Sequence, residues 1–404
     1  MNTFGRKLTL TTFGESHAAA IGGVLDGFPA GVRIDLNFIQ SELDKRKPGG
    51  SKFATARSEG DRVEILSGVF DGVSTGTPIG FIIRNENQKS GDYENLRELF
   101  RPGHADYAYY RKYGIRDHRG GGRSSARETA VRVAGGAIAQ ILLGKFGISV
   151  QSGVASVGEI SCGERLDFDL AARSEIFSLG NEEAMKEEIL KAKREHDSVG
   201  ASVVTVIRGA PAGLGEGLYY KFDAAIAAAM MGINGVKAVE VGEGVNASKM
   251  RGSKNNDSMS TAYAGVNLSV GNPTLDDADE LSNLNDGKFD EFKSEADGEA
   301  CCGSNSDEKF GFASNHAGGT LGGMTSGQEI VIKTYFKPTP SIFLSQPTQN
   351  VRGEDVICEL RGRHDPCIGV RGSVVATAMA RLVTADMLLL NLSANLANLK
   401  KIYG

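Results

Sequence analysis

The densest group of potentially reactive side chains lies between Arg101 and Arg132. This stretch reads RPGHADYAYYRKYGIRDHRGGGRSSARETAVR. It contains eight Arg or Lys residues and three acidic ones, whereas the whole chain has a formal charge of -5. It also holds two of the six histidines. Guanidinium groups bind phosphates and carboxylates, and imidazole exchanges protons near neutral pH. The stretch therefore predicts binding of a small polyanion and proton-assisted chemistry on it.

A helix is expected to position this segment. Ser125-Ala126-Arg127-Glu128 fits a capping box, and the apolar residues that follow recur at helical spacing, which predicts a helix over 126–143. The preceding Gly120 to Ser125, with its triple glycine, would then present N–H groups at the positive end of the helix dipole, where phosphate binds. A solvated basic turn before an ordinary helix fits the same residues.

Three further islands could contribute. In Gly14-Glu15-Ser16-His17, His17 could donate protons or serve as a structural hydrogen-bonding group. Ser16 as a hydrolase nucleophile is poorly supported because no G-x-S-x-G occurs. The cluster from Asp44 to Lys52 could clamp an anion, with Arg46 binding in bidentate fashion, or could be a solvated helix end.

The third of these islands is Arg363-His364-Asp365-Pro366-Cys367, again beside a predicted helix start. No partner histidine supports Cys367 as a nucleophile. A Walker loop and a G-x-G-x-x-G unit are both missing from the sequence, which disfavours nucleotide binding of those two kinds.

Composition places the chain among soluble globular enzymes, with 404 residues, 40% hydrophobic and 24% charged. Five cysteines without a CxxC pair indicate neither a disulfide framework nor a zinc site. The N-terminus has no apolar core of a signal peptide, and Asp386, Asn391 and Asn395 interrupt the longest apolar stretch. The sequence therefore predicts a soluble, cytoplasmic protein that does not span a membrane.

Short β-like runs alternate with helical patterns, which predicts a mixed α/β or α+β fold. The expected strands are Lys7–Thr12, Val63–Val69, Ile79–Ile83, Ser202–Ile207, Val236–Val241 and Gln328–Lys333. The expected helices cover 37–46, 126–143, 182–194, 222–231 and 374–397.

Two features indicate how the chain is organised. Gly27-Phe28-Pro29-Ala30-Gly31 recurs as Gly209-Ala210-Pro211-Ala212-Gly213, each after an apolar run and before a helix, which suggests two related halves. A shared strand-end turn that arose by chance is the alternative. Residues 259–308 are acidic and poor in aliphatic side chains, so we expect a flexible insertion there within a single catalytic domain, 1–404.

Taken together, these islands resemble the chorismate synthase family. The matching segments cover most of the chain and are TTFGESH (11–17), DGFPAG (26–31), RKPGGSK (46–52), the stretch 101–139, MGINGVKAVEVG (231–242), NHAGGTLGGMTSGQ (315–328), KPTPSI (337–342) and RHDPCIGVR (363–371). Departures include Ala18 after GESH, Lys45 and Lys47 in place of arginines, and Lys52 in place of Arg, each lysine keeping the charge without the planar fork.

The resemblance implies a fold in which helices lie between antiparallel sheets, usually as a homotetramer. It implies conversion of 5-enolpyruvylshikimate 3-phosphate to chorismate by 1,4-anti elimination of phosphate. Reduced FMN would be required but not consumed, and NADPH could be its reductant. The resemblance implies a small-molecule substrate and no nucleic-acid partner. The competing interpretation is a non-catalytic module that binds a polyanion such as RNA through the 101–132 stretch.

The resemblance also implies roles for particular residues. His17 and His104 would be the acids, one serving the departing phosphate and one the flavin, and Asp365 would relay a proton from the flavin. Substrate anions would contact Arg46, Lys52 and Arg132. The FMN contacts would be Arg123, Ser124, Ser125, Asn234, Gly235, Gly322, Lys337, Pro338, Thr339, Pro340, Ser341 and Arg363.

Overall fold

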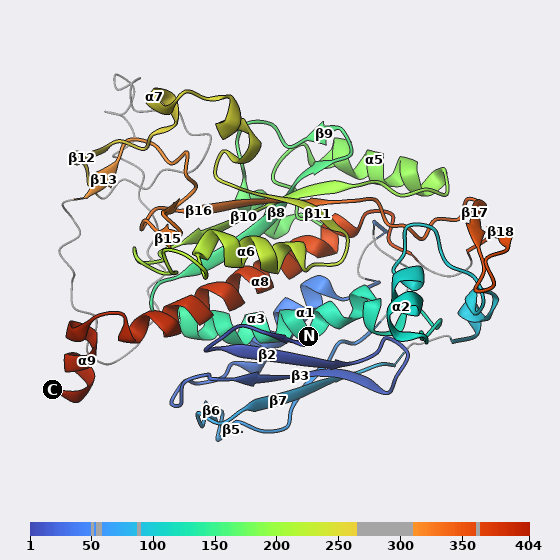
Figure 1. Ribbon diagram of the computed structural model, residues 1–404, viewed down its shortest axis with the longest axis horizontal. Coiled ribbons are helices and arrows are strands. Elements are labelled where there is room, and N and C mark those ends of the chain that lie inside the picture. The colour runs from blue at the N-terminus through green and yellow to red at the C-terminus, as the bar shows by residue number, and fades with distance from the viewer. Residues whose placement is uncertain (50–51, 54–58, 87–89, 265–309, 361–363) are drawn as a thin grey trace.

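The computed structural model describes residues 1–49, 52–53, 59–86, 90–264, 310–360 and 364–404. Two five-stranded antiparallel sheets enclose a layer of helices (Figure 1). The first sheet is ordered β1 (Thr3–Phe4), β2 (Thr9–Gly14), β3 (Ala20–Asp26), β7 (Ile79–Arg84) and β4 (Val63–Ile65). The second is ordered β11 (Val236–Val241), β16 (Ile330–Phe336), β10 (Ala201–Arg208), β8 (Ser149–Val157) and β9 (Ile160–Ser161).

Four helices fill the space between the sheets: α1 (Leu36–Arg46), α3 (Thr129–Gly144), α6 (Phe222–Met231) and α8 (Ile368–Leu390). Helix α3 packs on the first sheet, α8 packs on the second, and the two pack against each other. Gly136 permits this crossing, because a Cβ there would lie 2.6 Å from Cα of Ala378. The arrangement confirms the predicted α+β sandwich.

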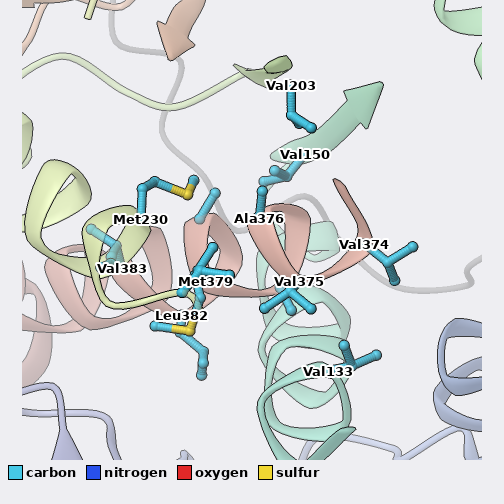
Figure 2. Close-up of a cluster of buried hydrophobic side chains, with 14 of the residues drawn as sticks. Val133, Val150, Val203, Met230, Val374, Val375, Ala376, Met379, Leu382 and Val383 are labelled. Carbon is cyan, nitrogen blue, oxygen red and sulfur yellow. The ribbon is translucent and has the colours of Figure 1, made fainter. Parts of the chain in front are cut away.

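The core is centred on α8. Figure 2 shows side chains from α3, β8, β10 and α6 gathered around it, among them Val133, Val150, Val203 and Met230. A helix that is enclosed on all sides is apolar all round. By length and composition alone, α8 could cross a membrane. However, 83% of its most apolar stretch is buried inside the protein, which explains its composition.

The fold contains two halves of the same design, as the repeated sequence predicts. The order β2-β3-α1-β4-β7-α3 recurs as β8-β10-α6-β11-β16-α8. In the first half, Gly31 N donates to Ser74 O at 2.9 Å and Val32 N to the Ser74 hydroxyl at 3.0 Å. In the second, Gly213 N donates to Thr325 O at 2.8 Å and Leu214 N to the Thr325 hydroxyl at 2.9 Å.

Glycine is needed at the start of both repeated turns. Gly27 has φ +79°, and a Cβ there would lie 1.9 Å from Lys7 O. Gly209 has φ +74°, and a Cβ there would lie 2.4 Å from Gly147 O. The shared motif is therefore a strand-end turn that both halves require.

Shorter elements surround this framework. The additional strands are β5 (Val69–Phe70), β6 (Val73–Ser74), β12 (Met259–Ala264), β13 (Gly311–Phe312), β14 (Thr320–Leu321), β15 (Met324–Thr325), β17 (Gln346–Gln349) and β18 (Asp355–Cys358). The additional helices are α2 (Asp106–Tyr113), α4 (Phe168–Arg173), α5 (Glu182–Arg194), α7 (Gly252–Asn255) and α9 (Leu396–Tyr403).

Several predicted boundaries were wrong. The helix expected over 374–397 is two helices, because α8 starts at Ile368 and Asn395 caps a separate α9. The strand expected over 63–69 ends at Ile65, and Gly68 turns the chain with φ +78° before β5 begins. Residues 259–264 of the expected insertion form β12, paired with β13, and the remainder of that segment lies outside the described residues.

Candidate active site

A cavity of about 430 Å³ opens at one end of the helix layer. Its walls come from the loop before α2, the start of the segment leading to α3, the turn between α6 and β11, the chain after β16 and the approach to α8. Predicted site residues on its walls are Arg46, His104, Ser124, Ser125, Asn234, Gly235, Lys337, Pro338, Thr339, Pro340, Ser341 and Asp365. The fold thus brings together residues that are more than 300 positions apart in the sequence.

The wall of this cavity is strongly basic. Among its described residues are six Arg or Lys side chains and one carboxylate, that of Asp365. Sequence reasoning had not assigned four of the cations, which are Arg101, Arg127, Lys237 and Arg371. Each of these four cations lies within a segment that matches the family. The family motifs could therefore have identified them, whereas a count of charges along the sequence could not.

One buried carboxylate, that of Asp61, holds two of these cations in place. Arg46 Nη2 donates to Asp61 Oδ2 at 3.0 Å, and Arg127 donates to the other oxygen of the same carboxylate. Arg46 also donates to Thr129 Oγ1 at 3.0 Å. Burial lowers the pKa of Arg46 to about 10, only partly offset by Asp61, so the side chain is still charged at neutral pH.

His104 belongs to a compact charged cluster. Arg101 Nε donates to Asp106 Oδ2 at 2.7 Å, and His104 Nδ1 lies 3.0 Å from Asp106 Oδ1. Asp106 is the first residue of α2, where a negative charge also stabilises the helix dipole. Burial lowers the pKa of His104, and this effect outweighs the opposing hydrogen bond with Asp106.

His17 lies just behind the cavity wall. Its ring makes an edge contact with Tyr93, with the centroids 5.2 Å apart, and its Nδ1 lies 3.0 Å from Ser16 Oγ. Tyr93 and Gly120, which contacts the same ring, both line the cavity. Ser16 is 1% exposed, which does not suit a nucleophile that must meet substrate.

Asp365 forms an ion pair with Arg371 at the start of α8. Elsewhere on the cavity wall, Lys337 Nζ donates to Gly103 O at 2.7 Å, and burial and the nearby Lys237 lower the pKa of Lys337. Cys367, by contrast, is buried, and burial raises the pKa of its thiol to about 11, so the neutral thiol prevails at neutral pH.

Besides His17, four predicted residues within the described part of the chain do not line this cavity. Arg123 and Arg132 line a neighbouring cavity of about 460 Å³, where Arg132 pairs with Glu128 at 2.8 Å. Lys52 is exposed, with its Nζ 5.1 Å from the Phe53 ring centre. Gly322 lies in the turn between β14 and β15. Arg363 lies outside the described residues.

The loop before α3 differs from the expected phosphate cradle. The N–H groups of Gly122, Ser124 and Ser125 bond to carbonyl groups within the same loop. The Ser125 hydroxyl accepts from Arg127 N rather than from Glu128 N, and Glu128 pairs with Arg132, so the reciprocal capping box is wrong. The reason is that the chain forms short 3-10 turns here before the α-helix begins.

Many cations of the 101–132 stretch have carboxylate partners. Arg101 and Arg116 contact Asp106, and Arg119 pairs with Asp117 at 2.9 Å. Arg116 also donates to the carbonyl groups of Leu96 and Leu99. Much of the local positive charge therefore builds the cavity wall and its supports, while Arg111 and Lys112 in the last turn of α2 are exposed.

Comparisons with known proteins agree with this geometry. The family profile described as chorismate synthase matches residues 8–389. Proteins named chorismate synthase are similar over the full length of both chains, with 65% identity in Campylobacter curvus and 62% in Campylobacter concisus. A solved structure described as the crystal structure of chorismate synthase matches with a TM-score of 0.68 and 28% identity, covering 98% of this chain and 96% of that one.

The matched family defines a lyase, and the basic cavity suits its small, phosphorylated substrate. The chain belongs to the chorismate synthase family. It accordingly acts in the shikimate pathway and eliminates phosphate from 5-enolpyruvylshikimate 3-phosphate to give chorismate. This assignment decides against both a serine hydrolase at Ser16 and a non-catalytic module as the protein's function.

Proposed function

We propose that the basic cavity holds reduced FMN and the enolpyruvyl substrate together, so that this chain works as a flavin-dependent chorismate synthase. The observation that carries the proposal is the meeting of His104, Asp365, Lys337 and Asn234 on one cavity whose described walls hold six cations and one carboxylate. The substrate has two carboxylates and a phosphate, and FMN adds a second phosphate. A strong positive field is needed to hold both ligands in one site.

Unused polar atoms in the walls support the fit of a ligand with many hydrogen-bonding groups. Asn234 Oδ1, Thr339 Oγ1 and Arg371 Nε are buried and have no partner within the described residues. A buried polar atom without a partner costs free energy, which a ligand can recover. Asn234, Gly235 and the segment 337–341 would hold the flavin, together with Ser124 and Ser125.

The protein's own part is positioning and proton handling. Reduced flavin, when bound, supplies the electron density that expels phosphate and accepts the substrate hydrogen without net oxidation. Once its ring is charged, His104 would hold the transferable proton on its Nε2 at the cavity, and His17 would supply one from behind Gly120 and Tyr93. Asp365, oriented by Arg371, would take a proton from the flavin side. Arg46 and Arg127 would bind substrate anions.

Other expectations remain proposals of the same kind. Roles for Lys52, Arg123, Arg132, Gly322 and Arg363 rest on the family resemblance alone. So do a homotetrameric assembly, a cytoplasmic location and the use of NADPH to reduce the flavin. Comparing activity in air with NADPH alone against activity with chemically reduced FMN separates the last point from the rest.

The test is an anaerobic assay with chemically reduced FMN and the phosphorylated substrate. Phosphate release and diene absorbance should rise together, with no net flavin oxidation. His17→Ala and His104→Ala should each lower turnover about 100-fold or more, the range for a lost general acid, while FMN binding measured by fluorescence persists. Full activity in both variants would contradict the acid roles. Turnover without flavin would contradict the cofactor assignment.

A further inference from the structure

Two neighbours compete for one nitrogen of the His104 ring. Asp106 Oδ1 and Arg101 Nη2 each lie 3.0 Å from His104 Nδ1. A guanidinium can only donate hydrogen bonds and a carboxylate can only accept them. Nδ1 therefore carries a hydrogen when it bonds Asp106, and carries none when it accepts from Arg101. The two hydrogen bonds are mutually exclusive, and the choice fixes which tautomer the ring adopts.

The geometry favours the bond with Asp106. Arg101 already has this carboxylate as its acceptor, because its Nε donates to Oδ2 at 2.7 Å and its Nη2 to Oδ1 at 2.8 Å. Arg101 N donates to Oδ2 as well, at 3.1 Å. Asp106 is 3% exposed and so cannot exchange these partners for water. A charge-assisted bond from Nδ1–H to this carboxylate is stronger than a neutral bond from Arg101 to Nδ1.

We propose that Asp106 is a positioning residue for the reaction: its Oδ1 accepts the Nδ1–H of His104 and so makes Nε2 the nitrogen that carries the transferable proton at the cavity. The inference rests on the proposed acid role of His104 and deepens it. Asp106 itself is not among the cavity-lining residues, so it acts through the histidine.

The charged groups around the His104 ring indicate at which stage Nε2 becomes protonated. Arg101, Arg116 and Asp106 act on the ring from the segment around α2, and Lys337 approaches from the chain after β16 through Gly103 O. Burial and the two arginines lower the pKa of His104, while Asp106 raises it. The ring is therefore mostly neutral at neutral pH before ligands bind. A bound anionic group beside Nε2 favours the charged ring, so substrate binding charges His104.

Asp106→Asn tests this role because it keeps the size and removes the charge. At pH 7.5 with saturating reduced FMN, kcat should fall roughly 100-fold, the range for a lost general acid. The alkaline limb of the kcat profile should move to lower pH, so activity recovers on acidification. KM should also rise, because Arg101 on the cavity wall loses its charged partner. A purely structural loss would lower activity at every pH alike, and that result would overturn the inference.

Asp61→Asn is the matched control. Asp61 is an equally buried carboxylate under two other arginines of the same wall, but no histidine of the described residues bonds to it. This variant should raise KM and leave the alkaline limb where it is. An equal shift of the alkaline limb of the kcat profile in both variants would mean that the loss of any buried negative charge lowers the pKa of His104. The positioning role of Asp106 would then be refuted.

The tautomer can also be read directly in the unaltered enzyme. In ¹⁵N-histidine spectra, assigned by comparison with His104→Asn, Nδ1 of His104 should carry the hydrogen, and in Asp106→Asn the hydrogen should move to Nε2 as Arg101 takes over Nδ1. A wild-type ring without a hydrogen on Nδ1 would overturn the inference even if Asp106→Asn does not fold. Full activity of His104→Asn would instead refute the proposed acid role itself.

Discussion

His17 and His104 pack against two consecutive glycines. A Cβ on Gly120 would lie 2.4 Å from Cε1 of His17, and a Cβ on Gly121 would lie 3.0 Å from Cε1 of His104. Both glycines have positive φ, +61° and +85°. The triple-glycine run therefore serves as a thin partition against which the two histidine rings can approach the same cavity.

The first prediction follows from this partition. Gly120→Ala should displace the His17 ring and lower kcat at least about tenfold, since misplacing a catalytic group by 1 Å can cost about 100-fold. Gly114→Ala is the matched control, because Gly114 also has a positive φ, +73°, and nothing lies near its Cβ position. It should lose about 1 kcal/mol of stability, the cost of a non-glycine residue in this conformation, with little loss of turnover. Equal losses of turnover in the two variants would show that strain alone is responsible.

A second prediction concerns the segment between β12 and β13. Ala264 pairs directly with Gly311, so the two ends of the segment lie side by side. Replacing 265–309 with a short Asn-Gly turn should leave kcat within about twofold of the original, because a β-hairpin needs only two connecting residues. The assay with reduced FMN measures this. Lost FMN binding in a variant with an unchanged melting temperature would show that the acidic segment contributes to the site.

A third prediction concerns Asp386, a fully buried carboxylate in α8. It accepts the N–H groups of Arg6, Lys7 and Leu8 and the Tyr220 hydroxyl, the last at 2.8 Å. Asp386→Ala should cost about 3 kcal/mol of unfolding free energy, because four hydrogen-bond donors lose a buried, charged acceptor. Tyr220→Phe removes one of these bonds and should cost about 1 kcal/mol. Urea unfolding at a fixed protein concentration measures both, and a smaller loss for Asp386→Ala than for Tyr220→Phe would contradict the assignment.

A fourth prediction concerns stability in acid. Burial alone raises the pKa of Glu42, but the positive charges of Arg381 and Lys45 outweigh it and leave the pKa below 4.5, its ordinary value. A carboxylate whose pKa is depressed in the folded state stabilises the protein above the unfolded pKa, and this contribution disappears as the pH falls through the folded pKa. The melting temperature should therefore decrease as the pH is lowered below about 4.5.

Glu42→Gln tests the source of that drop. The variant should be less stable than the original protein at pH 7, because Arg381 is left buried without its charged partner. Its melting temperature should then change less steeply between pH 5 and about pH 3. Parallel curves for the two proteins would show that other carboxylates, such as Asp61 and Asp106, control the acid response.

The sequence by itself determined the elements with strong local signals and the family. Helices 182–194 and 222–231 and strand 236–241 were predicted to the residue, because apolar spacing and flanking turns mark them clearly. The repeated glycine turn revealed the two halves, because each half needs a positive φ at the same place. Long, unusual motifs identified the family, because several such motifs in the same order along a chain are very unlikely to match by chance.

Only the tertiary structure decided which cations form the cavity and which serve as supports. Arg101, Arg116, Arg123 and Arg132 look alike in the sequence, yet Arg101 faces the cavity, Arg116 supports Asp106, and Arg123 and Arg132 face a neighbouring hollow. The difference depends on distant partners such as Thr12 O, which accepts from Arg123, and Gly232 O, which accepts from Arg132. Hydrogen bonding and burial depend on which residues are close in space, and the local sequence around each arginine does not show which residues those are.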